Sequence, residues 1–266
     1  MKKNIYPSSM IDKKRANEKF VILTAYDCLT AQLLEKSGVE YILVGDSLGN
    51  MFAGYDNTLP VTVEQMIYHG KAVCAGTEEA LVIMDMPYMS YQVSNEDAIL
   101  NAGRLIKEAG GKAVKIEVNP NQIDRVKAVV DSGIEVIGHI GLTPQTVYQL
   151  GGYGLQGKDQ EVSDKLSQLA LALEKAGCFS VLFEKIPSAL AAKLTSELTI
   201  PTLGIGAGVD CDGQILVTQD VLGATEGKPL KFVKQYASVF DASKKALEYF
   251  IEDVKTSQFP GEAHSF

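Results

Sequence analysis

Residues that build disulfide scaffolds, zinc sites or membrane spans are scarce in this 266-residue sequence. Its four cysteines form no C-x-x-C pair, and its three histidines form no H-x-x-E-H pattern. No apolar stretch approaches the roughly 18 residues of a transmembrane helix, and no apolar segment follows the N-terminal lysines as in a signal peptide. We therefore expect a cytoplasmic protein with buried thiols and without a zinc site.

Positive charge is also in short supply. The sequence has 25 lysines and arginines against 33 aspartates and glutamates, for a formal net charge of −8. Such an acidic chain is not expected to bind nucleic acid or an anionic membrane as its main partner. A small anionic substrate is not excluded, since a local site can be positive on an acidic protein.

Apolar segments, by contrast, recur in a regular order, and hydrophobic residues make up 46% of the chain. Short β-branched-rich runs that end in a polar residue alternate with amphipathic stretches, which predicts strands buried on both faces of a parallel sheet. About eight such units favour one (β/α)8 TIM-type barrel, an α/β fold of roughly 250 residues, so we predict a single domain over residues 1–266. The runs cover 20–27, 41–47, 81–87, 113–118, 135–141, 180–187 and 201–208, with a less clearly marked eighth at 214–220.

Helical patterns lie between these runs. Gly38 is placed to end the first of them, and Ser94 with Asp97 forms an acidic variant of a capping box at the start of the second. The Gly-rich stretch 151–160 is interpreted as a mobile loop over the site, and residues 253–266 as an irregular tail. The predicted helices cover 28–38, 94–111, 164–177 and 188–198.

Polar residues end most of the predicted strands. Because a β/α barrel builds its active site at the carboxyl ends of its strands, these residues are the candidates for the chemistry. They come from six different strands, which is a stronger signal than a local motif. The candidates are Asp27, Asp46, Ser47, Asp85, Lys115, Glu117, His139 and Glu184.

Asp46 and Asp85 follow apolar strands and indicate a metal site. Two carboxylates brought close together require a cation if both are to stay ionised. A site with few protein oxygen ligands suits Mg²⁺, which keeps waters or substrate oxygens around it. The alternative is that both aspartates are helix N-caps, since aspartate is common where a strand leads into a helix.

Lys115 and Glu117 stand two residues apart on one strand and therefore share a face. If that face is the barrel interior, the lysine needs a partner. The pair is then either a structural ion pair or a functional one, in which Lys115 holds a substrate carboxylate and Glu117 joins the shell of the metal.

Glu184 and His139 are candidates for proton transfer and substrate binding. Glu184 ends the apolar strand SVLFE, and an apolar setting makes a carboxylate a stronger base. The alternative is a salt bridge with Lys185. His139 is placed to hydrogen-bond a substrate oxygen, or it is a core histidine with satisfied hydrogen bonds.

The GIGAG segment at 204–208 contains glycines at alternate positions after a strand. The full spacing of a dinucleotide fingerprint is missing, and the segment comes late in the chain. Close backbone packing at one end of the barrel, or a phosphate-type anion site, is the better interpretation.

The motifs, taken together, resemble those of the ketopantoate hydroxymethyltransferases. They run in order over nearly the whole chain, and their combination is specific although no single motif is. The matching segments are TAYD (24–27), LVGDSLG (43–49), TLPVT (58–62), VKIE (114–117), GHIGLTPQ (138–145), GGYGLQG (151–157), LGIGAG (203–208), CDGQILV (211–217) and PGEAHSF (260–266).

This resemblance implies a Mg²⁺-dependent barrel that transfers a hydroxymethyl group from 5,10-methylenetetrahydrofolate, the co-substrate, to 3-methyl-2-oxobutanoate. The product is 2-dehydropantoate, on the route to pantothenate and coenzyme A. The resemblance also implies a homo-oligomer, typically a decamer. It assigns the metal to Asp46 and Asp85 with help from Glu117, and proton acceptance to Glu184. These two aspartates, Ser47 and Lys115 then bind the substrate.

Two positions depart from the family pattern. Residues 118–120 (VNP) replace a Gly-rich turn, and Lys185 follows the presumed base where a small or neutral residue is usual. Two other functions are kept as alternatives. One is a Mg²⁺-dependent carbon–carbon lyase of the isocitrate lyase and phosphoenolpyruvate mutase type, whose K-K-C-G-H loop has no match here. The other is a non-catalytic oligomeric scaffold.

Overall fold

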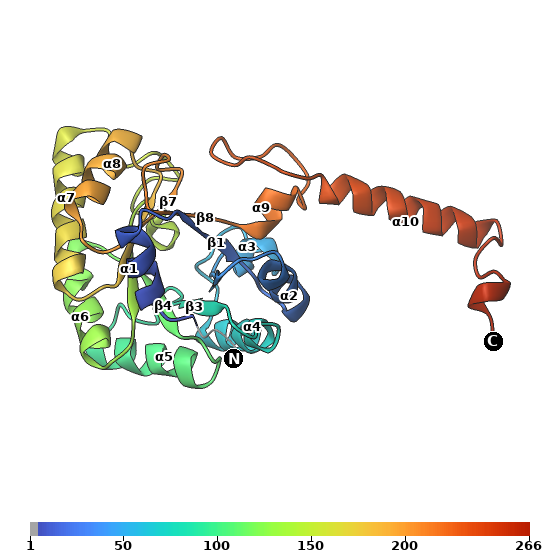
Figure 1. The fold of residues 1–266 in the computed structure, drawn as a ribbon, viewed down its shortest axis with the longest axis horizontal. Helices are drawn as coiled ribbons and strands as arrows, with labels where there is room; N and C mark the ends of the chain where they lie inside the picture. Colours follow the sequence, from blue (N-terminus) through green and yellow to red (C-terminus); the bar gives the residue numbers. More distant parts are fainter. Residues whose placement is uncertain (1–4) are drawn as a thin grey trace. The chain divides into compact units, whose positions relative to one another are not determined.

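The computed structural model describes residues 5–266 of the chain and contains a closed barrel of eight parallel strands (Figure 1). Strands consecutive in the sequence pair with one another, and β8 pairs with β1 to close the barrel. This confirms the predicted (β/α)8 TIM-type fold. Lys2 and Lys3, the N-terminal lysines discussed above, lie outside the described residues. The strands are β1 (Phe20–Thr24), β2 (Tyr41–Val44), β3 (Leu81–Asp85), β4 (Ala113–Glu117), β5 (Val136–Gly141), β6 (Ser180–Glu184), β7 (Thr202–Ile205) and β8 (Gly213–Leu216).

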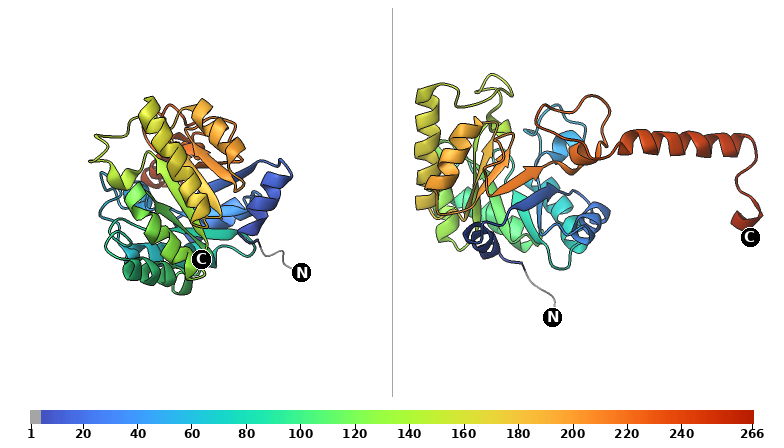
Figure 2. Two further views of the ribbon diagram at one scale, coloured as in Figure 1. Left: turned by 90° about the vertical axis from the view of Figure 1, so that its left-hand side faces the viewer. Right: turned by 45° about the horizontal axis from the view of Figure 1, so that its top comes forward.

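Helices connect the strands and pack on the outside of the barrel (Figure 2). All four predicted helices are present, while α4 and α6 have no counterpart among them. The helices of this part of the chain are α1 (Ser8–Arg15), α2 (Cys28–Lys36), α3 (Leu48–Met51), α4 (Val63–Ala75), α5 (Asn95–Lys107), α6 (Ile123–Asp131), α7 (Gln160–Lys175) and α8 (Ser188–Glu197), with short 3₁₀ turns η1 (Pro120–Gln122) and η2 (Pro144–Thr146).

Helix ends follow the expected side-chain chemistry. The Ser94 hydroxyl accepts a 3.0 Å hydrogen bond from the backbone N–H of Asp97, so Ser94 is the N-cap of α5, as predicted. The Asp97 carboxylate accepts its 3.0 Å hydrogen bond from the Ser94 hydroxyl and not from the Ser94 backbone, so the predicted capping box is only half formed. Gly38, with φ of +87°, lies just past the end of α2 in the left-handed conformation typical of a helix terminus. The eighth predicted run was wrong in its last part, because β8 ends at Leu216 and residues 218–220 are helical.

Side chains on each strand alternate between the barrel interior and the layer of helices. On β3, Leu81 and Ile83 belong to the interior apolar cluster, whereas Val82 and Met84 belong to the cluster under the helices. The same period of two makes Asp85 the next interior residue after Ile83. The interior rows are therefore apolar along most of their length and polar at the carboxyl ends of the strands.

The described chain forms two compact units, one ending at Leu216 and the other spanning Val217–Phe266. The second unit contains α9 (Thr218–Leu222), α10 (Val239–Lys255) and the 3₁₀ turn η3 (Glu262–His264). The irregular tail predicted for 253–266 was wrong for residues 253–255, which complete the last turn of α10. The single domain over 1–266 stays a prediction.

None of the described helices is both long and apolar enough to cross a membrane. The four cysteines, Cys28, Cys74, Cys178 and Cys211, are free thiols, and the latter two are buried. Burial raises the pKa of the Cys178 thiol to about 12, although a hydrogen bond from the backbone of Gly138 opposes this rise. Cys178 is therefore an unreactive thiol at neutral pH.

We predict that Gly141→Ala destabilises the barrel by about 2 kcal/mol or more. Gly141 has a φ of +98°, and a Cβ there would lie 2.3 Å from the carbonyl oxygen of Glu184 and 2.8 Å from Ile186 Cγ2. Urea denaturation measures the free energy of unfolding. Gly103→Ala is the matched control, because Gly103 lies inside α5 with no atom near its added Cβ, and it should gain roughly 0.5–1 kcal/mol. Equal stability of the two variants would contradict the prediction.

Candidate active site

Polar side chains fill the last interior positions of β3 to β6. Together with an aspartate from the loop after β2, they form a group that we call the strand-end cluster. Most of its members are almost fully buried, whereas the Glu184 side chain keeps 15% of its surface exposed. The cluster consists of Asp46, Asp85, Lys115, Glu117, His139 and Glu184.

Lys115 supplies the positive charge of the strand-end cluster. Its Nζ lies 2.8 Å from Asp85 Oδ1, 3.9 Å from Glu117 Oε1 and 3.4 Å from His139 Nδ1. Burial alone would lower the pKa of Lys115, but the carboxylates of Asp85, Glu117 and Asp46 outweigh it and raise this pKa. The side chain is therefore an ammonium ion at neutral pH. The prediction that Lys115 and Glu117 share a face is confirmed, and that face is the barrel interior.

Asp46 and Asp85 lie side by side, as the metal prediction requires. The backbone N–H of Asp46 donates a 3.1 Å hydrogen bond to Asp85 Oδ2. Burial, followed by the charge of Asp46, raises the pKa of Asp85 to about 7, while Lys115 acts in the opposite direction. Neither aspartate is the N-cap of a helix, since α3 is preceded by Ser47 and α5 by Ser94. The N-cap interpretation was therefore wrong for both.

Glu117 faces the same cluster from β4. Burial is the main reason that its pKa is raised well above the usual value, and the charges of Asp46 and Asp85 add to the effect, whereas Lys115 opposes it. Its Oε2 accepts a 2.9 Å hydrogen bond from the backbone N–H of Gln145. Its Oε1 is buried and accepts no hydrogen bond. One oxygen of this carboxylate is thus fixed by a hydrogen bond, and the other faces the cluster with only the 3.9 Å contact to Lys115 and a 3.7 Å contact to His139 Nδ1.

His139 lies between Lys115 and Glu184. Burial, reinforced by the nearby Lys115 charge, lowers the pKa of the imidazole, so the ring is neutral at pH 7. Because an ammonium group can only donate, Lys115 makes Nδ1 the acceptor and leaves the ring proton on Nε2. Nε2 lies 3.4 Å from Glu184 Oε2 but makes no well-directed hydrogen bond. The interpretation of His139 as a satisfied core residue does not fit this environment.

The structure separates the two remaining strand-end candidates. Ser47 follows Asp46 at the start of α3, and its hydroxyl is 2.8 Å from the Tyr26 hydroxyl. Asp27, by contrast, is the N-cap of α2, where its carboxylate accepts hydrogen bonds from the backbone N–H and the hydroxyl of Thr30. Asp27 therefore has a structural role that the sequence pattern alone did not reveal.

Sequence reasoning missed Gln145 and Tyr91, which support the cluster from outside. The Gln145 amide nitrogen lies 2.9 Å from Asp46 Oδ2, and its amide oxygen is 2.7 Å from the Tyr91 hydroxyl. Both residues are buried. Gln145 closes the GHIGLTPQ motif, which was the available signal, but an uncharged residue in a loop carried no chemical reason to be chosen.

Lys185, the residue that departs from the family pattern, contacts the Gly-rich loop. Its side chain donates to the carbonyl oxygen of Tyr153, and its own carbonyl oxygen accepts a 2.8 Å hydrogen bond from Gln156 N–H. The pKa of the Tyr153 hydroxyl is raised, first by burial and then by surrounding groups that include Tyr148 and Asp46. This loop therefore lies close to the strand-end cluster, as expected, and its mobility stays a prediction.

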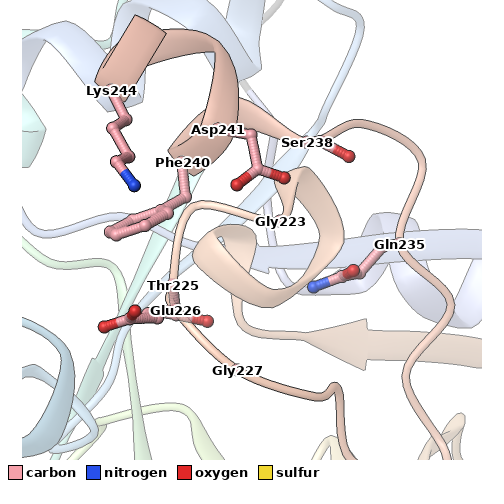
Figure 3. Close-up of a pocket in the computed structure, with 9 residues that line it drawn as sticks. All are labelled: Gly223, Thr225, Glu226, Gly227, Gln235, Ser238, Phe240, Asp241 and Lys244. Carbon is pink, nitrogen blue, oxygen red and sulfur yellow. The ribbon is translucent and has the colours of Figure 1, made fainter. Parts of the chain in front are cut away.

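Two other features lie apart from this chemistry. A Cβ on Gly208 of the GIGAG segment would lie 2.6 Å from Ser188 Cβ, in agreement with the close-packing interpretation. Figure 3 shows a pocket formed wholly by residues of the second unit, with Glu226, Asp241 and Lys244 as its charged lining residues. No member of the strand-end cluster lines this pocket.

The donor set of the cluster limits the kind of metal site it can form. Among the described residues, no group of three or more histidine, cysteine, aspartate or glutamate side chains is arranged to hold an ion. Asp46 and Asp85 nevertheless provide adjacent carboxylates, and Glu117 Oε1 has an unused lone pair. Such a site suits an ion that takes few protein ligands and completes its shell with water or substrate oxygens, as Mg²⁺ does.

Solved structures share this fold at low sequence identity. Phosphoenolpyruvate phosphomutase from Streptomyces platensis subsp. rosaceus aligns with a TM-score of 0.63 and 16% identity, covering 95% of this chain and 88% of that one. A 2,3-dimethylmalate lyase described as a phosphoenolpyruvate mutase/isocitrate lyase superfamily member aligns with a TM-score of 0.62 and 17% identity, covering 96% and 89%. At these identities the similarity concerns the fold alone.

Curated relatives share much more of the sequence. A 3-methyl-2-oxobutanoate hydroxymethyltransferase from Carboxydothermus hydrogenoformans is 50% identical over 97% of this chain and 94% of its own length. One from Geotalea uraniireducens is 50% identical over the full length of both chains. The family model of ketopantoate hydroxymethyltransferase matches residues 5–262. The resemblance seen in the motifs is confirmed, and the chain belongs to the ketopantoate hydroxymethyltransferase family.

Proposed function

We propose that the strand-end cluster transfers a hydroxymethyl group from 5,10-methylenetetrahydrofolate to 3-methyl-2-oxobutanoate, which forms 2-dehydropantoate. The observation that carries this proposal is the burial of one ammonium group among several carboxylates, at the carboxyl ends of β3 to β6 and in the loop after β2. The curated relatives that match nearly the whole chain at 50% identity carry the corresponding enzyme name. A small 2-oxo acid matches a cluster that offers both a cationic anchor and a base.

The ion belongs beside Asp46 and Asp85, with Glu117 in support. These residues fit a divalent cation because Asp46, Asp85 and Glu117 share the single positive charge of Lys115, and Glu117 Oε1 accepts no hydrogen bond. When bound, Mg²⁺ supplies Lewis acidity toward the keto and carboxylate oxygens of a 2-oxo acid. The same two aspartates then act as substrate-binding residues, since the substrate shares their ion.

Lys115, Ser47 and His139 orient the substrate. Lys115 is held as an ammonium ion and offers its charge to the substrate carboxylate. The neutral His139 offers Nε2–H to a substrate oxygen, and Ser47 offers its hydroxyl. Fixing the 2-oxo acid in this way exposes C3 to the base and to the one-carbon donor in a defined geometry.

Glu184 accepts the C3 proton. Its carboxylate keeps 15% exposure, so it is the member of the cluster that incoming substrate can reach most easily, and it lies 3.4 Å from His139 Nε2. The carbon that has lost its proton then bonds to the one-carbon unit of the folate, and the bonds of that carbon to the two folate nitrogens break. One water molecule supplies the hydroxyl group of the product. Its second proton and the proton taken from C3 end on the two nitrogens, so tetrahydrofolate leaves. The competing assignment gives Glu184 a structural role beside Lys185 and leaves Glu117 as the base.

We also propose a homo-oligomer, with the decamer as the expected assembly. The support comes from α10, on which no residue is buried. Its exposed apolar side chains include Leu247, Tyr249, Phe250 and Ile251, and Phe259 follows in the C-terminal segment. Apolar surface of this extent is typical of an interface between subunits.

Asp46→Asn and Asp85→Asn should each weaken Mg²⁺ binding sharply and abolish most activity, because each removes a negative charge from the ion's neighbours. Isothermal titration calorimetry measures the affinity. Asp27→Asn is the matched control, since asparagine still caps α2 and Asp27 stands outside the cluster. Unchanged Mg²⁺ affinity in both cluster variants would remove the aspartates from the metal site.

Glu184→Gln should lose about 10²–10⁴-fold in rate, the typical contribution of a positioned general base. The glutamine keeps the size of the side chain but cannot accept the proton. Deuterium exchange at C3 of 3-methyl-2-oxobutanoate measures this step without the folate, and turnover should fall in parallel. Mg²⁺ affinity should persist, because the metal residues are unchanged. If Glu184→Gln exchanges deuterium at a rate close to that of the parent enzyme, Glu117 is left as the base. Glu161→Gln, on the surface of α7, is the control for the loss of a carboxylate.

Light scattering should give a mass near ten times the 28.7 kDa of one chain. Leu247→Asp should lower this mass, because it places a charge on the exposed apolar side of α10. Circular dichroism checks that the variant retains its helices. A parent protein that remains a monomer at micromolar concentration would contradict the assembly.

A further inference from the structure

Gln145 links two carboxylates from different parts of the barrel, that of Asp46 in the loop after β2 and that of Glu117 on β4. It lies in the 3₁₀ turn η2 after β5 and is 3% exposed. Its Nε2 donates hydrogen bonds of 2.9 Å to Asp46 Oδ2 and 2.9 Å to the carbonyl oxygen of Met86. Its backbone N–H donates a 2.9 Å hydrogen bond to Glu117 Oε2. One residue therefore holds one oxygen of each carboxylate.

The orientation of this amide is fixed by its partners. Nε2 has two hydrogens, and both meet oxygens that can only accept when Asp46 is ionised. The Oε1 atom faces donors on the other side, the Tyr91 hydroxyl at 2.7 Å and Gln92 Nε2 at 3.3 Å. Rotating the amide by a half-turn would set its oxygen against Asp46 and the Met86 carbonyl, so a single orientation is strongly preferred.

The contacts also determine which carboxylate oxygens stay available. Asp46 Oδ2 and Glu117 Oε2 are each occupied by a hydrogen bond from Gln145. Glu117 Oε1 is buried without a hydrogen bond. An isolated carboxylate rotates easily about its last torsion, and a hydrogen bond to one oxygen removes that freedom while leaving the other oxygen for a ligand.

We propose that Gln145 is a positioning residue that aims Asp46, through its side chain, and Glu117, through its backbone, toward the divalent cation of the site. This inference rests on the proposed function, because it requires an ion beside Asp46. Gln145 does not touch the reacting atoms. It restricts Asp46 to a single orientation before the ion arrives, so the ion need not order that side chain on binding.

Gln145→Met tests the side-chain part of this arrangement in the full-length enzyme. Methionine has a similar length and no hydrogen-bond donor, and the backbone N–H to Glu117 is retained. The Mg²⁺ dissociation constant measured by calorimetry should rise about 10–100-fold, the usual effect of losing a residue that orients a metal ligand. Activity should recover as Mg²⁺ is raised, since the residues that touch the substrate are unchanged.

Two further variants make the outcome decisive. Gln92→Met removes the partner at the amide oxygen rather than the one at Asp46, and it should leave the Mg²⁺ affinity unchanged. If Gln145→Met and Gln92→Met lose the same amount of Mg²⁺ affinity, the loop has been loosened in general and the inference is overturned. If Asp46→Asn weakens Mg²⁺ binding while Gln145→Met does not, the inference is wrong and the proposed function stands. If Asp46→Asn also has no effect, the proposed metal site itself fails.

Discussion

The buried contact between Lys115 and Asp85, 2.8 Å long, is the interaction around which the site is organised. One ammonium ion faces Asp85, Glu117 and Asp46, so the carboxylates outnumber the positive charge that is available to them. Burial, and after it the charges of neighbouring carboxylates, raises the pKa of Asp85 to about 7 and that of Glu117 well above its usual value, so both groups hold a proton more tightly. A divalent cation would displace those protons and satisfy the same negative potential.

The barrel creates this arrangement through the period of two along each strand. Interior positions that are filled by Leu81 and Ile83 lower on β3 are followed by Asp85, and Ala113 on β4 is followed by Lys115 and Glu117. The register then pairs Asp85 with Lys115, and Glu117 with His139, on neighbouring strands. A shift of one residue on any of these strands would turn its polar group toward the helices.

The barrel strands and most residues of the strand-end cluster could be predicted from the sequence, because the inward and outward alternation of side chains and the ends of strands follow from local patterns. The spacing of Lys115 and Glu117 alone predicts that they share a face, and the structure shows that this face is the barrel interior. Asp27 looked equivalent to Asp46, but whether an aspartate after a strand caps a helix or joins a site depends on where the next helix begins, here directly after Asp27. Gln145 was missed because its role depends on contacts with Asp46, in the loop after β2, and with Glu117 on β4, which are far away in the sequence. Those contacts exist only once the barrel has closed.

Stability alone does not explain why these residues occupy the barrel interior. Branched apolar side chains usually fill such positions, and replacing a buried ion pair by apolar residues of similar volume is often neutral or stabilising. Here the Lys115–Asp85 ion pair, the neutral His139 and the carboxyl group of Glu117 stand where valine or leucine would pack well. Their cost in desolvation is offset only partly by mutual contacts, since Glu117 Oε1 and His139 Nε2 lack hydrogen bonds. A 2-oxo acid and its cation can supply the partners that these groups lack in the resting protein. The proposed reaction therefore explains why polar residues occupy these positions, whereas packing of the barrel core does not.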